Sequence, residues 1–210
     1  MSLIFRSCTV EDIDDVIPLM YSSGPDAFRF TFSVNSKLQV LEFLRVAFLK
    51  GEGEFGYKDH IVAVDNGEIV ALVGMRSAQD NIDYTLAIAK TIFAFYGIFN
   101  GIRVVIRGLR FERVVSPPKK NVLCLHNLGV KEQVRGKGYG QKLIAHFIQK
   151  ANERSETAVG LDVAETNPRA KALYLRLGFE VKSATDGGFY NKYGRAVTHE
   201  YMEYSLKPKT

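Results

Sequence analysis

The sequence predicts an α/β (α+β) fold in a single domain over residues 1–210. One reason is that residues 60–75 read as two apolar runs joined at Asn66-Gly67, a pair that supplies the positive φ angles of a tight β-hairpin. The other is that residues 121–178 read twice as an apolar strand followed by a helical pattern. A chain of 210 residues that is 46% hydrophobic is long enough to bury one substantial core.

The start of the chain and its cysteines indicate the compartment. Acidic residues from Glu11 to Asp15 follow the first strand-like segment, which excludes a secretory signal, so we expect a cytoplasmic protein. Cys8 and Cys124 lie far apart in apolar segments, and we expect both to be reduced core residues.

Charge and histidine spacing say less about ligands. The formal net charge of +5 favours acidic ligands in general, whether phosphates, nucleic acid or an anionic membrane surface, without choosing among them. We expect no metal site, because no pair of histidines has ligand spacing. The four histidines are His60, His126, His146 and His199.

The first half should open with a strand at residues 2–6 and a helix capped by Thr9 or Asp12. A loop rich in glycine, proline and phenylalanine is expected at residues 23–32, and a second helix after it ends at Gly51. Both helices are marked by apolar residues at helical spacing: Ile13, Val16, Ile17 and Met20 in the first, and Leu38, Leu41, Leu44 and Phe48 in the second.

Residues 77–120 differ from the rest of the chain. Residues 82–102 are strongly apolar and approach the roughly twenty residues that a membrane span needs, but Asp83 and Lys90 lie inside them. Glycines at positions 97 and 101 interrupt the run. We expect a buried or lid-forming helical pair rather than a transmembrane segment, with a dimer interface or a peripheral membrane contact as alternatives. The arginines that follow on one helical face, Arg103, Arg107 and Arg110, are typical of a solvated surface.

The second half is regular. A buried strand at residues 121–130 is followed by a glycine-rich stretch and an amphipathic helix. After a strand at residues 157–164, Asn167 and Pro168 supply the N-cap and the first position of a short helix. That helix should stop at Gly178, before two closing strands.

The glycine-rich stretch VRGKGYGQKL, residues 134–143, predicts an anion site. A strand, a glycine loop and a helix start direct free backbone N–H groups and the positive end of the helix dipole to one point. The pattern of a mononucleotide P-loop is absent. A dinucleotide site needs Gly-x-Gly-x-x-Gly, whereas this loop reads Gly-x-Gly-x-Gly. Asp162 does lie at a suitable distance along the chain for the ribose contact of such a site. A purely structural tight turn is the remaining alternative.

Two blocks of this half resemble the GNAT N-acetyltransferase superfamily. The first resembles that family's Arg/Gln-x-x-Gly-x-Gly/Ala loop for the acyl-CoA pyrophosphate: Arg135-Gly136-Lys137-Gly138-Tyr139-Gly140. The second resembles the family's next block: Asn167-Pro168-Arg169-Ala170-Lys171-Ala172-Leu173-Tyr174, then Leu177-Gly178-Phe179. The resemblance implies a mixed central sheet flanked by helices, with splayed fourth and fifth strands, over nearly the whole chain. Residues 77–120 are an insertion between the third and fourth strands.

The resemblance also implies acetyl-CoA as co-substrate and positions for its binding residues. Leu128 and Val130 would offer backbone contacts to the pantetheine arm, and Asn167 would lie near it. Lys137 or Lys142 would reach the 3′-phosphate. The pyrophosphate would bind the amides of Arg135, Gly136, Lys137, Gly138, Tyr139 and Gly140.

For catalysis, the resemblance implies that an amine attacks the thioester and that Tyr174 protonates the departing thiolate. The general base is left open between His126 on the fourth strand, whose ordinary pKa is near 6.5, and Asp162 on the fifth. A mechanism without a dedicated protein base is the third possibility.

The predicted function is therefore N-acetyl transfer to a primary amine, either on a small molecule or on a protein. A non-catalytic acyl-CoA-binding module of the same fold is the alternative. No nucleic-acid partner is expected, because the arginine cluster comes with no recognised motif. A homodimer is an expectation from the family. We expect the acceptor site near residues 21–32 and the insertion.

Overall fold

The computed structural model describes residues 3–36, 39–51, 53–79 and 81–206. A sheet of seven strands forms the centre of the described structure, in the order β1-β2-β3-β4-β5-β9-β6. Neighbouring strands are antiparallel except for β4 and β5, which are parallel. The strands are β1 (Ile4–Ser7), β2 (His60–Asp65), β3 (Glu68–Arg76), β4 (Val122–Val130), β5 (Ala158–Ala164), β6 (Glu180–Thr185) and β9 (His199–Ser205).

The predicted hairpin is confirmed between β2 and β3. Asn66 and Gly67 have φ angles of 52° and 82°, as a tight turn between two strands requires. The register pairs Ile61 with Val73 and places both strands beside β4.

The splay predicted between β4 and β5 is also present. The two strands pair over only three rungs, the last of which joins Cys124 to Gly160. Beyond that rung β4 continues to pair with β3, and β5 with β9. The facing edges of β4 and β5 therefore separate from residues 125 and 161 onward.

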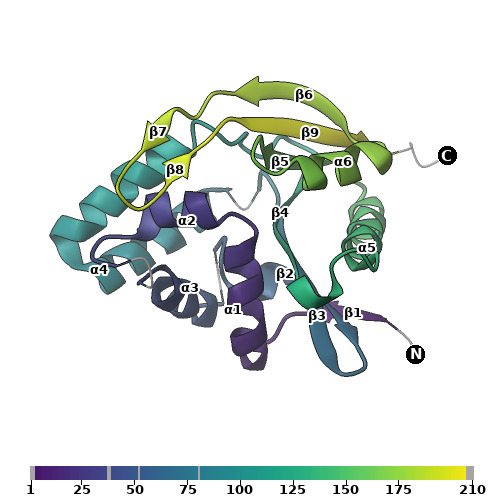
Figure 1. Cartoon of the computed structure of the whole chain (residues 1–210), viewed down its shortest axis with the longest axis horizontal. Helices are drawn as coiled ribbons and strands as arrows, with labels where there is room; N and C mark the ends of the chain where they lie inside the picture. Colours follow the sequence, from purple (N-terminus) through teal and green to yellow (C-terminus); the bar gives the residue numbers. More distant parts are fainter. Residues whose placement is uncertain (1–2, 37–38, 52, 80, 207–210) are drawn as a thin grey trace.

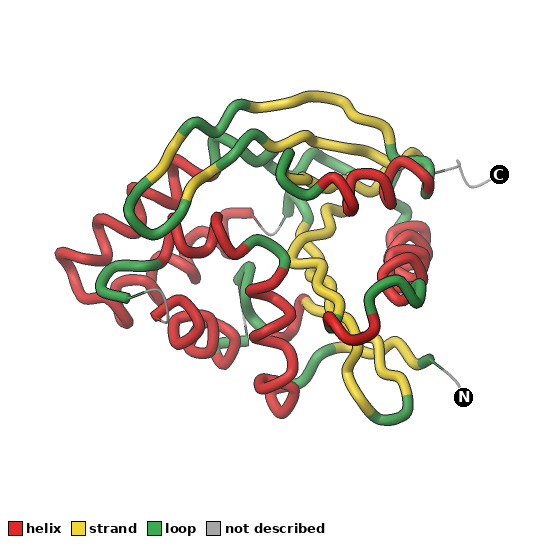
Figure 2. Tube along the Cα trace, viewed as in Figure 1, coloured by secondary structure: helices red, strands yellow, loops and turns green. Residues whose placement is uncertain are grey.

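Helices cover both faces of the sheet (Figure 1; Figure 2). One face carries α5 (Tyr139–Glu153) and α6 (Pro168–Arg176), and a cluster including Leu143, Phe147 and Tyr174 fills the space beneath them. The other face carries the remaining α-helices: α1 (Ile13–Ser22), α2 (Pro25–Phe32), α3 (Gln39–Leu49) and α4 (Asn81–Phe111). Short 3-10 turns lie at η1 (Val10–Asp12), η2 (Tyr57–Asp59) and η3 (Glu132–Val134).

The prediction of a loop at residues 23–32 is wrong. Pro25 occupies the first turn of α2, where its missing N–H costs no hydrogen bond, and the helix runs to Phe32. Its phenylalanines are all buried and form part of the core. Local glycine and proline content suggested a loop, but burial of this aromatic face stabilises a helix. The predicted Leu38 lies outside the described residues.

A small hairpin at the end of the chain was not predicted. β7 (Phe189–Tyr190) and β8 (Arg195–Ala196) pair with each other and lie over α2 (Figure 1). Asn191 fastens this hairpin, because its side-chain amide donates to the carbonyl of Phe30 at 2.9 Å. Strands of two residues are too short to produce a readable alternation of apolar and polar positions.

The predicted helical insertion is α4. Gly97, with φ 71° and ψ 179°, interrupts it and divides it into two helical segments. The inner side packs on α2 and α3, and the hydroxyl of buried Tyr96 donates to the carbonyl of Phe32 at 2.6 Å. Only 22% of its most apolar window is buried, so the expectation of a buried helical pair holds for the inner side alone.

Candidate active site

Polar side chains lie beside the opening between β4 and β5. His126 and Asp162 each come two residues after the last shared rung, Cys124 with Gly160. Because side chains of a strand alternate between faces, both project to the face covered by α1–α4. The intervening residues Leu125 and Leu161 project to the opposite face, into the core beneath α5. One candidate base thus lies on each side of the opening.

Asp162 is held by the segment that follows α4. Its two carboxylate oxygens accept from the backbone N–H of Ser116, both at 3.2 Å. Burial raises the pKa of Asp162 to about 6, partly offset by the Ser116 hydrogen bond. A carboxylate with this pKa is ionised at neutral pH and suited to accept a proton.

His126 is tightly packed against β2 and β3. Its ring lies across Gly74, where an added Cβ would approach the ring to 2.4 Å, and 5.5 Å from the ring of His60. Both nitrogens of His126 are shielded from solvent and have no hydrogen-bond partner among the described residues. Burial lowers the pKa of His126 to about 4, helped by the nearby charge of Arg76. The ring is therefore neutral at pH 7.

Sequence reasoning missed a charged pair next to this histidine. The guanidinium of Arg76, at the end of β3, lies 3.8 Å from the carboxylate of Glu54. Burial raises the pKa of Glu54, and the charge of Arg76 lowers it. A signal was present, since Glu54 is a carboxylate inside the glycine-rich run at residues 51–56, but that run has no recognised motif.

Tyr174 occupies the opposite face of the sheet. It lies in the last turn of α6, is 6% exposed, and packs against Phe179 with ring centroids 5.8 Å apart. Burial raises the pKa of Tyr174, so the phenol keeps its proton at neutral pH. Asn167 begins the same helix as predicted, because its side-chain oxygen accepts from the N–H of Ala170 at 3.2 Å.

The glycine loop adopts the conformation that its composition predicts. Gly136 and Gly138 have φ angles of 85° and 83°, and an added Cβ at either would meet nothing within 4 Å. Gly138 is the N-cap of α5, so the N–H groups of the helix's first turn point out beside open space. This arrangement suits a bound anion.

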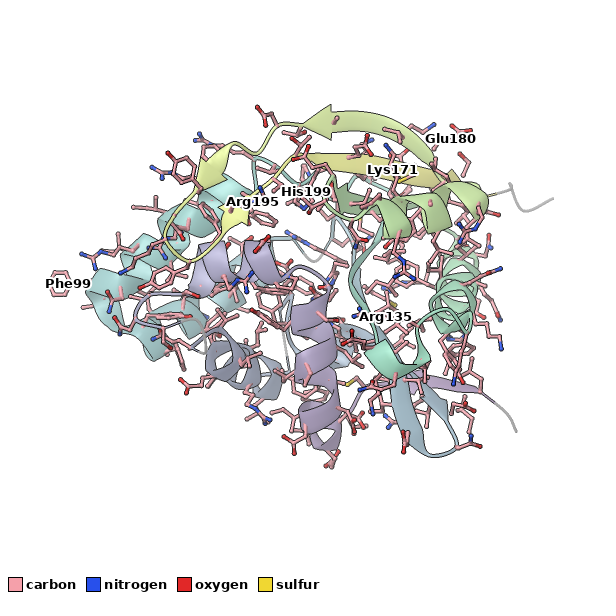
Figure 3. The ribbon with its side chains drawn as sticks, in the orientation of Figure 1. Phe99, Arg135, Lys171, Glu180, Arg195 and His199 are labelled. Carbon is pink, nitrogen blue, oxygen red and sulfur yellow. The ribbon has the colours of Figure 1, made fainter. Side chains whose placement is uncertain are left out.

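Side chains fix the loop to the sheet. The hydroxyl of Tyr139 donates to Asp65 at 2.5 Å, and Nε of Arg135 donates to the carbonyl of Val130 at 3.2 Å. Two amides of the predicted set are used inside the turn, since Arg135 bonds Glu132 and Lys137 bonds Val134. Arg135 lies at the lower end of β4 (Figure 3).

The edge of β4 beside the opening is not paired at Val130 with another of the strands that the structure describes. The N–H of Lys131 bonds to the carbonyl of Val70 on β3. Because backbone groups alternate in direction along a strand, those of Val130 point to the other edge, toward the opening, where the carbonyl accepts from Arg135. The second predicted position, Leu128, follows a bulge at Asn127, whose φ is 51°. The glycine loop follows this end of β4 in the chain.

A sheet that opens between its two parallel strands, beside a glycine loop that suits an anion, defines an α/β protein with a candidate ligand site at that opening. Within this class the chain belongs to the acetyltransferase (GNAT) family, whose model matches residues 30–179. Both sequence blocks that carried the resemblance fall within or at the end of that range.

Solved structures share the fold. One described as the crystal structure of an acetyltransferase superposes with a TM-score of 0.72 at 22% identity, covering 97% of this chain and 100% of that one. An N-acetyltransferase from Staphylococcus aureus Mu50 gives a TM-score of 0.71 at 15% identity, covering 96% and 100%.

A curated relative is more similar in sequence over a shorter stretch. The 5-NmdU N-acetyltransferase of Pseudomonas phage PaMx11 is 39% identical over 77 residues, which are 37% of this chain and 50% of the relative. The chain matches half or less of the length of its curated relatives.

Proposed function

We propose that this chain transfers the acetyl group of acetyl-CoA to a primary amine by direct attack through a tetrahedral intermediate. The single observation that carries the proposal is the opening between β4 and β5, which ends at an uncovered glycine loop and has ionisable groups on both faces. Membership of the acetyltransferase (GNAT) family supports the same reaction.

The residues around the opening fit acetyl-CoA. A pantetheine arm carries amides, which could pair with the edge of β4 at Leu128 and Val130 as another strand would, once Nε of Arg135 releases the carbonyl of Val130. The first-turn amides of α5 suit a pyrophosphate, because glycine lets an anion approach the backbone closely. Lys137 is exposed, and Lys142 lies 5.9 Å from the ring centre of Tyr139, so both can add positive charge there.

The chemistry requires one proton to leave the amine and another to reach the thiolate as the C–N bond forms and the C–S bond breaks. Tyr174, protonated and buried on the α6 side, would supply the proton to sulfur. On the other face Asp162, with a pKa of about 6, is better matched to accept a proton at neutral pH than His126, with a pKa of about 4.

Calorimetric titration with acetyl-CoA tests the proposal, with NADH as the control for a general nucleotide site. A free-thiol release assay over a panel of amines follows. We expect saturable binding of acetyl-CoA, no response to NADH, and thiol release that depends on the amine. Binding without release for any amine would favour the non-catalytic module, and absence of binding would refute both.

A further inference from the structure

The outer face of α4 exposes large apolar side chains to solvent. Ile98 is 71% exposed and Phe99 is 85% exposed, directly after the kink at Gly97. Phe99 projects from the end of the molecule, away from every other element (Figure 3). The face as a whole comprises Phe93, Ile98, Phe99, Ile102, Ile106 and Leu109.

These residues form a stripe rather than scattered contacts. At about 100° per residue, the apolar positions from Ile98 to Leu109 fall within roughly one quarter to one third of the helix circumference. Arg103 and Arg110 are exposed along the border of that stripe. An apolar stripe edged by arginine is the pattern of a helix that lies in a membrane interface.

We propose that the outer face of α4 docks the protein on an anionic lipid membrane surface. Charge complementarity selects this occupant, because residues 84–111 contain no Asp or Glu but carry Lys90 and three arginines. Anionic headgroups attract such a segment within a Debye length. The proposal does not depend on the acetyl-transfer function.

A groove on the same face suits a lipid. Ile106, Leu109, Arg110 and Arg113 line an open hollow of about 300 Å³. Two apolar side chains beside two guanidinium groups can receive part of an acyl chain and an anionic headgroup together, since a guanidinium binds phosphate or carboxylate oxygens through several N–H groups.

The alternative occupants fit less well. By length and composition Tyr84–Phe111 could cross a membrane, with a mean hydropathy of 1.4. However, Gly97 divides it into segments shorter than a span, and Arg107 is held against the body by a 2.6 Å hydrogen bond to the carbonyl of Ser33. A two-fold dimer through this face would bring the same arginines of both copies together without a carboxylate from residues 84–111 to pair with them.

Vesicle flotation with the full chain tests the proposal. The probes are vesicles of phosphatidylcholine alone and of phosphatidylcholine mixed with phosphatidylglycerol, at low and high salt. We expect binding to the anionic vesicles about tenfold or more tighter than to the neutral ones, weakening as salt is raised.

Two double variants, each with a matched control, test whether the outer face of α4 binds the vesicles. Ile98→Ser with Phe99→Ser should lower binding to anionic vesicles about tenfold or more. Its matched control, Ile4→Ser with Val181→Ser, removes exposed apolar side chains from the two edge strands of the sheet, β1 and β6, and should leave binding unchanged. Arg110→Gln with Arg113→Gln should also weaken binding, whereas Arg154→Gln with Arg176→Gln should not. Circular dichroism checks that each variant is folded.

Equal binding to both vesicle types, or no binding to either, would overturn the proposal. So would a finding that the variant with Ile98→Ser and Phe99→Ser binds anionic vesicles as tightly as the unsubstituted protein does. Sedimentation showing a dimer that the Ile98 and Phe99 substitutions dissociate would assign the face to a second copy instead. Thiol release with a soluble amine, measured without vesicles, should be unchanged in the variant with Ile98→Ser and Phe99→Ser.

Discussion

At the scale of single residues, the two residues proposed for proton transfer lie on opposite faces of the sheet. Asp162 lies on the face covered by α1–α4, where Ser116 fixes its carboxylate, and Tyr174 lies in the core cluster on the face covered by α5 and α6. Burial raises both pKa values: that of Asp162, about 6, still lies below neutral pH, so its carboxylate is ionised, whereas the phenol of Tyr174 stays protonated. A reacting group in the opening would therefore meet an acceptor of protons from one face and a donor from the other.

Tyr174→Phe should lower turnover roughly a hundredfold, because general acid catalysis is typically worth that much or more. Acetyl-CoA affinity should change little, since the ring and its packing on Phe179 are retained. Steady-state kinetics and calorimetry measure the two quantities. Unchanged turnover would remove Tyr174 from the mechanism.

Asp162→Asn tests the base through the pH profile of kcat. With an amine acceptor that is neutral throughout the range, activity of the parent should rise with pH through about 6 as Asp162 loses its proton. The variant should lose this rise and roughly a hundredfold in turnover. Asparagine keeps an oxygen for the N–H of Ser116, so the fold is conserved.

His126→Gln is the matched comparison. If His126 is the base instead, the rise should lie near pH 4, where burial places its pKa, and Asp162→Asn should leave that rise in place. A rise of kcat near pH 6 that persists in both variants would exclude both residues as the general base.

At the scale of elements, the glycine loop is the feature on which ligand binding depends. The positive φ angles of Gly136 and Gly138 aim the start of α5 at uncovered space, and Tyr139 ties the loop to the β2–β3 hairpin. The loop can therefore present its amides in one arrangement before any ligand arrives.

Gly138→Asp should reduce acetyl-CoA affinity by more than tenfold, because a carboxylate would fill the open space and repel a pyrophosphate. Gly138→Asn is the matched control: it is nearly the same size, tolerates the left-handed region and carries no charge. Calorimetry should show markedly weaker binding for Asp than for Asn. Parental affinity in the Asp variant would contradict the assignment of the loop.

The sequence predicts well those elements that are stabilised by residues close together in the chain. The hairpin at Asn66-Gly67, the cap at Asn167 and the strands β4 and β5 are specified by neighbouring residues, and each is confirmed. The helix α2 was mistaken for a loop because its stability comes from burying phenylalanines against other elements. Propensity is a weak prior when tertiary packing opposes it.

At the scale of the whole molecule, hydrogen bonds on its inner side attach α4 to the body. The hydroxyl of Tyr96 and the guanidinium of Arg107 donate to adjacent carbonyls at the end of α2, those of Phe32 and Ser33. The outer face of α4 is left uncovered in the described part of the chain. Attachment on one side and exposure on the other are what a docking element requires.

Tyr96→Phe should lower the free energy of unfolding by about 1–3 kcal/mol, because it leaves the buried carbonyl of Phe32 without its partner. Tyr190→Phe, at an 86% exposed position on β7, should change it by less than about 0.5 kcal/mol. Urea denaturation measures both. Equal stability of the two variants would show that the contact between α4 and α2 contributes little.

The sequence by itself determined the α/β class, the order of the main strands and helices, and the family, because glycine loops, caps and apolar periodicity act over a few neighbouring residues. It also singled out Tyr174, His126 and Asp162 as candidates for proton transfer. Only the tertiary structure placed Asp162 against Ser116 and His126 against Gly74, and only it showed which side of α4 is covered. These arrangements depend on residues far apart in the chain, whose burial and mutual distances no local pattern records.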